Sequence, residues 1–440
     1  MSVSKKCFLT LWLIGCPLVY AENINSSCPS LNKNTPLSLN QAISYTLCHN
    51  PDTQQQWAQL QSQEAAVTIA QSNLYPTLSL QGSASSSHNQ QTQNSLGLQA
   101  RASYVLFDFG QRQANKTQAL ALLQQAQWNQ QSTLADLSHQ VVSAYLTVLQ
   151  TQGQIEVSQQ NLQANQKSLD SAEARFKVGT ATPLDVLQAK SALAQTRLTL
   201  VKAKSDYAAQ RGRLALLIGL IPTELAELQA IDFESIPATI TQDDLTQLLQ
   251  QAAQQRPEIK AAKANLQATE QALISAKTTL KPTISLSAAT GWQQTEGSNN
   301  QNSSIGLSID MPFDIGGGIQ AKIKQSEAQK TQQEISMQRN LQQIYQEVWQ
   351  AFYQLQAAIE TVTASNEGLS SSAQAAKVAL ARYELGLSTM LDVLNAQSQE
   401  ASSRQQVAKA QYDALIARNN LNFSLGQTLV TPTAQGYVQP

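Results

Sequence analysis

The chain has 440 residues, 13% of which are charged, and its formal net charge at pH 7 is −1. This charged fraction is about half the usual share, so Gln, Asn, Ser and Thr must supply most of the polar surface. A nearly neutral chain lacks the basic face that nucleic-acid binding requires, which excludes that class of partner. Beyond the N-terminal leader, no apolar run reaches the length of about 18 residues expected of a transmembrane helix.

The N-terminus predicts a signal peptide over residues 1–21. MSVSKK is a short basic region, and the apolar run CFLTLWLIGCPLVYA that follows is too short to span a membrane. Val19-Tyr20-Ala21 is a suitable cleavage site. Leu13-Ile14-Gly15-Cys16 also resembles a lipobox, so lipidation at Cys16 stays open, although Pro17 fits that alternative poorly.

After either cleavage, Cys28 and Cys48 remain in the mature chain. An exported protein meets an oxidising compartment, where a disulfide between the two is the natural interpretation. Two buried thiols are the alternative.

Glycine and proline predict two very long helices. Between Gly110 and Gly179 there is no proline and one internal glycine, and the same holds between Gly318 and Gly386. Each stretch predicts a helix of roughly 65 residues, about 100 Å long.

Four shorter helices accompany the long ones, over Pro51–Tyr75, Pro183–Ile218, Pro257–Lys281 and Thr389–Leu425. One helix of about 25 residues and one of about 36, placed end to end, nearly match a long helix. Side-by-side packing of short and long helices is therefore expected. A soluble antiparallel coiled coil is the alternative.

Two β-hairpins are predicted between the helices, at about residues 77–107 and 283–313. Their apolar side chains alternate strictly with small and polar ones, at Leu96, Leu98, Ala100, Ala102, Tyr104 and Leu106 in the first hairpin and at Ile305, Leu307, Ile309, Met311 and Phe313 in the second. Strands of about 10 to 12 residues with period two are typical of transmembrane β-strands. Four strands cannot close a barrel, so several protomers must contribute, and three would supply twelve strands.

One motif occurs twice, as RFKVGTATPLDVLQA from Arg175 and RYELGLSTMLDVLNA from Arg382. In each copy a helix stops at a glycine, and a threonine with an aspartate three residues later starts the next helix as a capping box. The pairs are Thr182 with Asp185 and Thr389 with Asp392. Both copies therefore predict tight helical hairpin tips, and the repeat indicates a duplication.

These motifs, together with PTLSL and PTISL before the hairpins and LFDFG and PFDIG after them, resemble the TolC-type outer-membrane efflux proteins over nearly the whole mature chain. The resemblance implies a mainly α fold with a membrane β part. It further implies a homotrimer in outer-membrane lipid, whose twelve-stranded β-barrel continues into a periplasmic α-barrel. Such channels work with a periplasmic adaptor and an inner-membrane pump of RND or ABC type, to export drugs and other small molecules or, alternatively, polypeptides by type I secretion. The cargo is not evident from the sequence.

The same resemblance divides the mature chain into two structural repeats, residues 22–219 and 257–426. The segment 220–256 between them is expected to form a linker on the equatorial belt around the helices, and 427–440 forms a C-terminal tail.

The resemblance also assigns roles at the tips. In the family, an aspartate at the position of Asp392 and an acidic residue one turn later narrow the entrance; the later position is Asn395 here. A capping role alone is the alternative for Asp392. A polar link between Tyr383 and Asp185 is expected to fasten the tips, whereas the position of a second fastening arginine holds Ser388. The adaptor is expected to contact Gly179, Thr180, Gly386 and Leu387.

Catalytic, cofactor and metal sites are not expected. His49, His88 and His139 show no metal-ligand spacing, and Gly316–Gly318 fits a strand-to-helix turn better than a phosphate-binding loop, since no Lys-Ser/Thr follows. A periplasmic coiled-coil adaptor is the rival class of protein, and the alternating strands argue against it.

Overall fold

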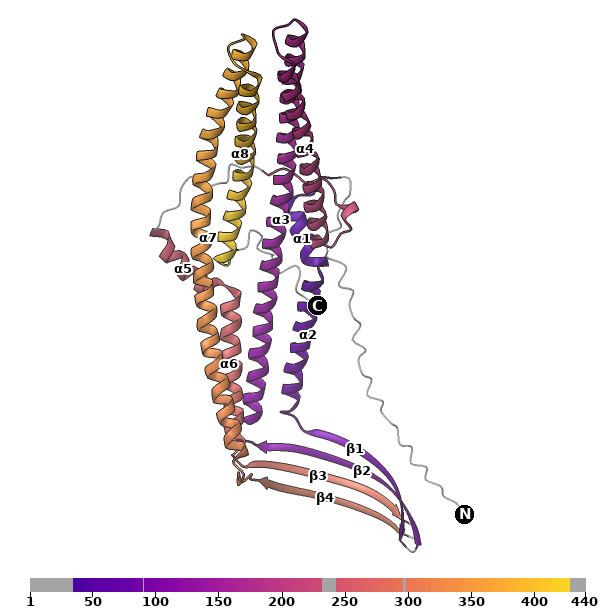
Figure 1. The fold of residues 1–440 in the computed structure, drawn as a ribbon. Coiled ribbons are helices and arrows are strands. Elements are labelled where there is room, and N and C mark those ends of the chain that lie inside the picture. Colours follow the sequence, from indigo (N-terminus) through magenta and orange to yellow (C-terminus); the bar gives the residue numbers. More distant parts are fainter. Residues whose placement is uncertain (1–34, 90, 232–242, 296–297, 428–440) are drawn as a thin grey trace.

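The computed structural model describes residues 35–89, 91–231, 243–295 and 298–427. The leader with Cys16 and the cleavage site after Ala21, Cys28 and nearly all of the C-terminal tail lie outside these residues. The described chain forms a long column of helices with a curved sheet at one end (Figure 1).

Two 67-residue helices, α3 (Gln111–Lys177) and α7 (Gly318–Glu384), run the length of the column. On the half away from the sheet, α4 (Pro183–Ile218) packs on α3 and α8 (Met390–Ser424) packs on α7. On the half beside the sheet, the shorter helices are α2 (Pro51–Ser72) and α6 (Pro257–Thr278). The side-by-side arrangement of short and long helices expected from the sequence is therefore present.

The two repeats meet along α3, which also contacts α6 and α8. Around the middle of the column lie α1 (Leu39–His49), the 3-10 turn η2 (Pro222–Glu224) and α5 (Asp243–Gln255). The helix α5 was not anticipated within the expected linker. Cys48, in α1, is disulfide-bonded; its pairing with Cys28 stays a prediction, because Cys28 is outside the described residues.

The middle of the column is held by buried contacts to α3. Leu37 and Leu228 form a parallel β-bridge. Tyr145 Oη on α3 lies 2.8 Å from Leu37 O and 2.7 Å from Gln229 O. Burial raises the pKa of Tyr145 to about 12. The segment before α1, at Leu37, and the linker, at Gln229, are thus both fixed to the long helix α3.

The sheet has four antiparallel strands in the order β1 (Thr77–Asn89), β2 (Gln91–Phe107), β3 (Thr283–Thr295) and β4 (Ser298–Asp310). Its strands have 13, 17, 13 and 13 residues and are longer than expected. The register places apolar residues beside one another across the strands, as in the row Leu78, Ala102, Ala288 and Ile305. The adjacent row on the opposite face is Ser79, Arg101, Ala289 and Ser304.

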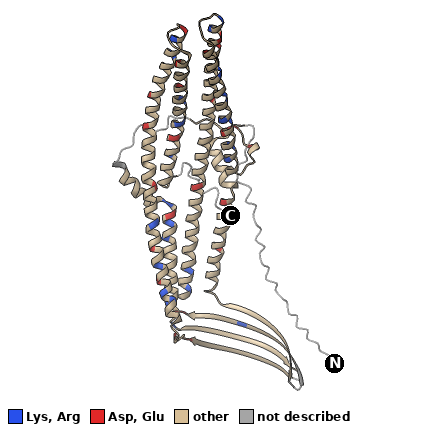
Figure 2. Ribbon diagram, viewed as in Figure 1, with Lys and Arg blue, Asp and Glu red and all other residues tan. Residues whose placement is uncertain are grey.

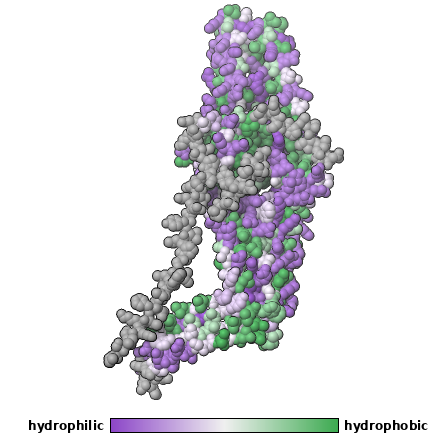
Figure 3. Space-filling model, turned by 180° about the vertical axis from the view of Figure 1, so that it is seen from behind, coloured by the Kyte–Doolittle hydropathy of each residue, from purple (hydrophilic) through white to green (hydrophobic). Residues whose placement is uncertain are grey.

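One face of the sheet is therefore apolar and exposed in the single chain, with Leu78 80% and Ile305 77% accessible. Figure 2 shows hardly any charge on the strands, and Figure 3 shows hydrophobic residues gathered where the sheet meets the helices. Strands β1 and β4 are the two edges of the sheet. A sheet with this composition and two open edges is suited to lipid only after further strands pair with it.

An aspartate turns the chain from each hairpin into its long helix. Asp108 Oδ2 accepts a hydrogen bond of 2.9 Å from Arg112 N, at the start of α3. Asp314 Oδ2 accepts one of 2.8 Å from Gln320 N, at the start of α7. Between the aspartate and the helix, Gly110 (φ 91°) and Gly317 (φ 70°) adopt the left-handed conformation that glycine tolerates. Gly316 and Gly317 accordingly belong to the strand-to-helix turn, and Gly318 is the first residue of α7.

Candidate functional site at the helical tips

Both tips end their incoming helix with the same pair of backbone hydrogen bonds. Thr180 N donates to Arg175 O at 2.9 Å and Gly179 N to Phe176 O at 3.0 Å; Leu387 N donates to Arg382 O at 2.8 Å and Gly386 N to Tyr383 O at 2.9 Å. This is the Schellman pattern, and each glycine has φ of 76°. The duplicated motif therefore gives two tips with matching backbones.

Both tips also begin their outgoing helix with a capping box. The Thr182 hydroxyl accepts from Asp185 N, and Asp185 Oδ2 accepts from Thr182 N at 2.8 Å. Thr389 and Asp392 make the same exchange, with Asp392 Oδ2 2.9 Å from Thr389 N. The two aspartates thus complete the capping boxes at the starts of α4 and α8, as the sequence indicates.

Asp392 is exposed at its tip, as is Asn395 one turn later on α8. Hydrogen bonds from the Thr389 backbone N–H and then from its hydroxyl hold the pKa of Asp392 below its usual value of 3.8, and the Arg382 charge also contributes. The side chain is consequently a permanent negative charge at neutral pH.

Tyr383 is buried in the apolar core between the tips, with 4% of its surface exposed. This tip core consists of Leu169, Ala172, Ala189, Leu193, Tyr383, Met390 and Val393. Tyr383 Oη has no hydrogen-bond partner among the described residues. The expected hydrogen bond to Asp185 is therefore not formed, and Asp185 Oδ2 instead accepts hydrogen bonds from Thr182 at the start of α4.

Tyr383 and Asp185 still act on each other electrostatically. Burial, and next the negative charge of Asp185, raises the pKa of the Tyr383 phenol. Ser388, which occupies the expected arginine position, donates from Oγ to Ala379 O at 3.3 Å. That hydrogen bond lies within the second tip and does not connect it to the first tip.

Arg175 makes the connection that the sequence did not assign. Its Nη1 donates to Glu384 O at 2.6 Å, and its Cζ lies 5.0 Å from the centre of the Tyr383 ring. Its place as the first residue of the repeated motif was the available signal. The motif alone could not show that Arg175 reaches the other tip, because the two copies differ in this respect. Arg382, at the same motif position in the second copy, is exposed and lies near Asp392.

Below the tips, a series of polar contacts joins α3 to α8, here called the α3–α8 ladder. Its contacts are Ser168–Gln397 at 3.0 Å, Gln160–Arg404 at 2.9 Å, Gln150–Asp413 at 2.8 Å and His139–Asn419 at 2.9 Å. The positions rise along α8 as they fall along α3, as antiparallel helices require. The ladder fixes the two repeats to each other between the tips and the middle of the column.

The ends of the tips are accessible and largely apolar. Gly179, Thr180 and Gly386 are exposed, and Leu387 is 65% accessible. Their neighbours Val178 and Leu385 are 74% and 75% accessible. Exposed apolar residues clustered at a loop are typical of a contact surface for another protein.

Within the described ranges, no cluster of three or more His, Cys, Asp or Glu side chains could hold a metal ion. None of the described helices combines the length and the apolar character needed to cross a membrane.

A sheet with one apolar face, joined to a helical column of about 100 Å that ends in exposed tips, fits a channel protein of the outer membrane. The family model for "Outer membrane efflux protein" matches residues 42–220 and 248–427. The chain belongs to this family. It is an outer-membrane exit channel that extends into the periplasm, and its family is one of transport proteins rather than enzymes.

Similar proteins include Protein CyaE of Bordetella pertussis, 28% identical over 387 residues that cover 86% of this chain and 81% of the relative. Outer membrane protein TolC of Escherichia coli is 23% identical over 396 residues, covering 86% and 80%. Among solved structures, CusC matches with a TM-score of 0.81 at 22% identity, covering 90% of this chain and 96% of that chain. VceC of Vibrio cholerae matches with a TM-score of 0.78 at 24% identity, covering 89% and 97%. The structures establish the shared fold.

Proposed function

We propose that three copies of this chain form a closed export duct, with a twelve-stranded barrel in the outer membrane and a helical barrel in the periplasm. The observation that carries the proposal is the four-stranded sheet, whose apolar face is exposed and whose β1 and β4 edges are unpaired. Pairing β4 of one protomer with β1 of the next removes every edge. Three copies of four strands give a barrel wider than the roughly eight strands that fill their own interior.

The mass of the assembly in mild detergent tests this proposal. Native mass spectrometry or light scattering should give three chains per particle. Proline substitutions at edge positions of β4, such as Ser304→Pro, should lower the yield of the assembly, because proline cannot donate to the strand pairing. A monomeric particle that remains folded and stable would contradict the trimer.

At the periplasmic end, the duct receives cargo through an adaptor and an inner-membrane pump of RND or ABC type. The exposed tip residues Gly179, Thr180, Gly386 and Leu387 form the contact surface for the adaptor. Three copies of Asp392, with Asn395 one turn further, narrow the entrance, and the ring of carboxylates favours cations. Photocrosslinkers at Leu387 should capture the adaptor, whereas crosslinkers at the exposed Ile69, far from the tips, should not.

We infer that the cargo consists of drugs or other small molecules. Relatives support this: "Antibiotic efflux pump outer membrane protein ArpC" of Pseudomonas putida is 26% identical over 424 residues, which cover 91% of this chain. A deletion strain should become more susceptible to small toxic compounds and keep its profile of secreted proteins. Loss of a secreted polypeptide without a change in susceptibility would instead indicate type I secretion.

A further inference from the structure

We propose that Arg175 is a latch: it fastens the two helical tips of one protomer to each other and sets how readily the periplasmic end opens. The inference rests on the proposed channel function. It assigns the fastening to a residue in the first copy of the motif, in place of the Tyr383–Asp185 hydrogen bond.

The first contact of the latch is made to a helix end. Glu384 is the last residue of α7, so its carbonyl is one of the four that the helix itself leaves without a partner. The C-terminal end of a helix also carries a partial negative charge, which favours a cation. Arg175 Nη1 supplies both the hydrogen bond, at 2.6 Å, and the positive charge. The link runs from the end of α3 to the end of α7, and therefore from one tip to the other.

The second contact is made to the tip core. The Arg175 guanidinium lies over the Tyr383 ring, with Cζ 5.0 Å from its centre, a geometry that favours a cation. A methyl group added at Gly386 would lie 3.6 Å from Arg175 Nη2, so a side chain at this position would touch the guanidinium. One side chain thus contacts two neighbouring residues of the second tip, Tyr383 and Glu384.

The latch is built to open. Arg175 is half-buried, its Nε has no partner among the described residues, and its Nη1 donates to a single carbonyl, that of Glu384. The next polar contact between the repeats is Ser168–Gln397 in the α3–α8 ladder. It lies seven residues, or about 10 Å, further along α3. Between Arg175 and the ladder, the described residues of the two repeats are joined by the apolar tip core alone, so opening of the tips separates that core over about two helical turns and leaves the ladder intact.

The duplicated motif shows which tip holds the latch. In the first copy the residue after the arginine is Phe176, which is 46% exposed; in the second copy it is Tyr383, which is buried. Arg382 is exposed and faces Asp392 rather than the other tip. Of the two motif arginines, Arg175, which precedes the exposed Phe176, is the one that contacts the buried Tyr383 of the other tip.

Single-channel recording of the full-length protein in planar bilayers tests the latch. The variants are Arg175→Ala and Arg175→Lys, and Lys177→Ala is the matched control, since Lys177 is an exposed cation two residues away on the same helix. Arg175→Ala should raise the open fraction about tenfold, the size expected for loss of a charge-assisted hydrogen bond. Arg175→Lys should have an intermediate effect, because a lysine lacks the planar fork that contacts carbonyl and ring together. Lys177→Ala should match the wild type.

The outcomes separate the latch from the channel function. If the wild type conducts and both Arg175 variants show its open fraction, the latch is refuted and the channel function stands. If Lys177→Ala opens the channel as much as Arg175→Ala, the effect comes from net charge and the latch is again refuted. If the folded wild-type protein forms no channel, the proposed function itself fails. Should Arg175→Ala not yield folded protein, Arg175→Lys decides by the same criteria.

Discussion

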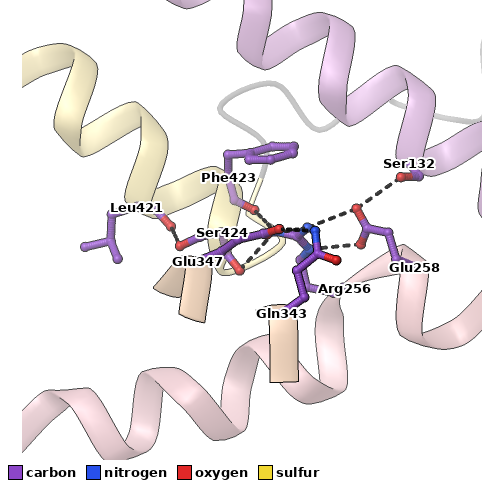
Figure 4. Close-up of polar contacts among 8 residues, drawn as sticks. All are labelled: Ser132, Arg256, Glu258, Gln343, Glu347, Leu421, Phe423 and Ser424. Carbon is purple, nitrogen blue, oxygen red and sulfur yellow. Dashed lines mark hydrogen bonds and ion pairs between the residues drawn. The ribbon is translucent and has the colours of Figure 1, made fainter. Parts of the chain in front are cut away.

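Two arginines each bind the C-terminal end of another helix, Arg175 at the tips and Arg256 near the middle of the column, and their surroundings differ. Arg256, at the start of α6, is 5% exposed. It pairs with Glu258 at 2.9 Å and with Glu347 at 3.0 Å, and its Nη1 donates to Phe423 O and Ser424 O at the end of α8 (Figure 4). Arg175, at the tip, is half-buried and holds one carbonyl at the end of α7.

The network around Arg256 extends to further helices. Glu258 accepts a hydrogen bond of 3.1 Å from Ser132 on α3, and Glu347 lies on α7. The Arg256 guanidinium also lies 5.0 Å from the centre of the Phe423 ring. One buried cation therefore joins α3, α6, α7 and α8 near the middle of the column. An arginine at a helix end therefore makes a permanent connection where it is buried and has several partners, and a releasable one where it is half-exposed and has a single hydrogen-bond acceptor.

The largest expected loss of stability follows from removal of the Arg256 side chain. Arg256→Ala leaves Glu258 and Glu347 without their cation and the end of α8 without its donors. Breaking a buried ion pair by removing one partner costs about 3–5 kcal/mol. Denaturant unfolding in detergent should show a loss of this size. The matched control is Lys277→Ala, which removes an exposed ion pair to Glu327 and should cost at most about 1 kcal/mol. Equal losses for the two variants would contradict the distinction.

A second prediction concerns pH near Arg256. His139 stacks on Phe423, and burial, followed by the positive charge of Arg256, lowers its pKa below the usual 6.5. As the pH falls below 6.5, His139 binds a proton in the unfolded chain before it does so in the folded chain. This group therefore lowers the stability of the fold as the pH falls below 6.5. His139→Gln should flatten the stability profile in that range, measured by unfolding at a series of pH values.

Asp136 acts in the opposite sense. Burial, and then the charge of Glu258, raises its pKa above the usual 3.8, so the folded chain binds its proton first and gains stability as the pH falls through that raised value. Asp136→Asn should raise stability at neutral pH. A profile unchanged by either substitution would show that neither group is coupled to folding.

The third prediction concerns the local stability of the second tip, for which a smaller change is expected. Arg175→Ala should increase hydrogen exchange at the amides of Leu385, Gly386 and Leu387 while the middle of the column keeps its protection. The lost bond is partly solvent-exposed, so a local change of about 1 kcal/mol is expected. Exchange that spreads to α3 beyond the ladder would mean that the tip is not an independent unit.

A still smaller effect is expected for Tyr383→Phe. The ring and its contact with Arg175 remain, and the substitution removes a buried hydroxyl that has no partner among the described residues. A buried hydroxyl without a hydrogen bond is unfavourable, so the variant should be as stable as the wild type or slightly more so. A loss of stability together with a rise in conductance would restore the Tyr383–Asp185 link in place of the latch.

The sequence allowed prediction wherever the determining interactions are local. The ends of α3 and α7, the alternating strands and both capping boxes depend on residues within a few positions of one another. The Arg175 and Arg256 contacts join positions far apart in the chain, and nothing at either position distinguishes a bridging arginine from a solvated one. Helix α5 was not predicted because it lies in the segment 220–256, which contains prolines at 222 and 237 and was interpreted as a linker on the equatorial belt.

The last comparison separates the two capping aspartates by their effect on selectivity, since their effects on stability are expected to be small and alike. Asp185→Asn and Asp392→Asn each weaken one capping box and should cost similar, small amounts of stability. Of these two aspartates, Asp392 is exposed and Asp185 is half-buried. Asp392→Asn should therefore lower cation selectivity in bilayer recordings, whereas Asp185→Asn should not.

The pH dependence of that selectivity provides an independent check. The Thr389 hydrogen bonds hold the pKa of Asp392 below 3.8, so its charge persists as the pH falls to that value and is lost only below it. Selectivity of the wild type should therefore persist down to a pH near 4. The Asp392→Asn channel should show the same low selectivity across that range, because an amide does not titrate. Selectivity that fell at a higher pH, or that survived in Asp392→Asn, would place the controlling charge elsewhere in the duct and leave Asp392 as a helix cap alone.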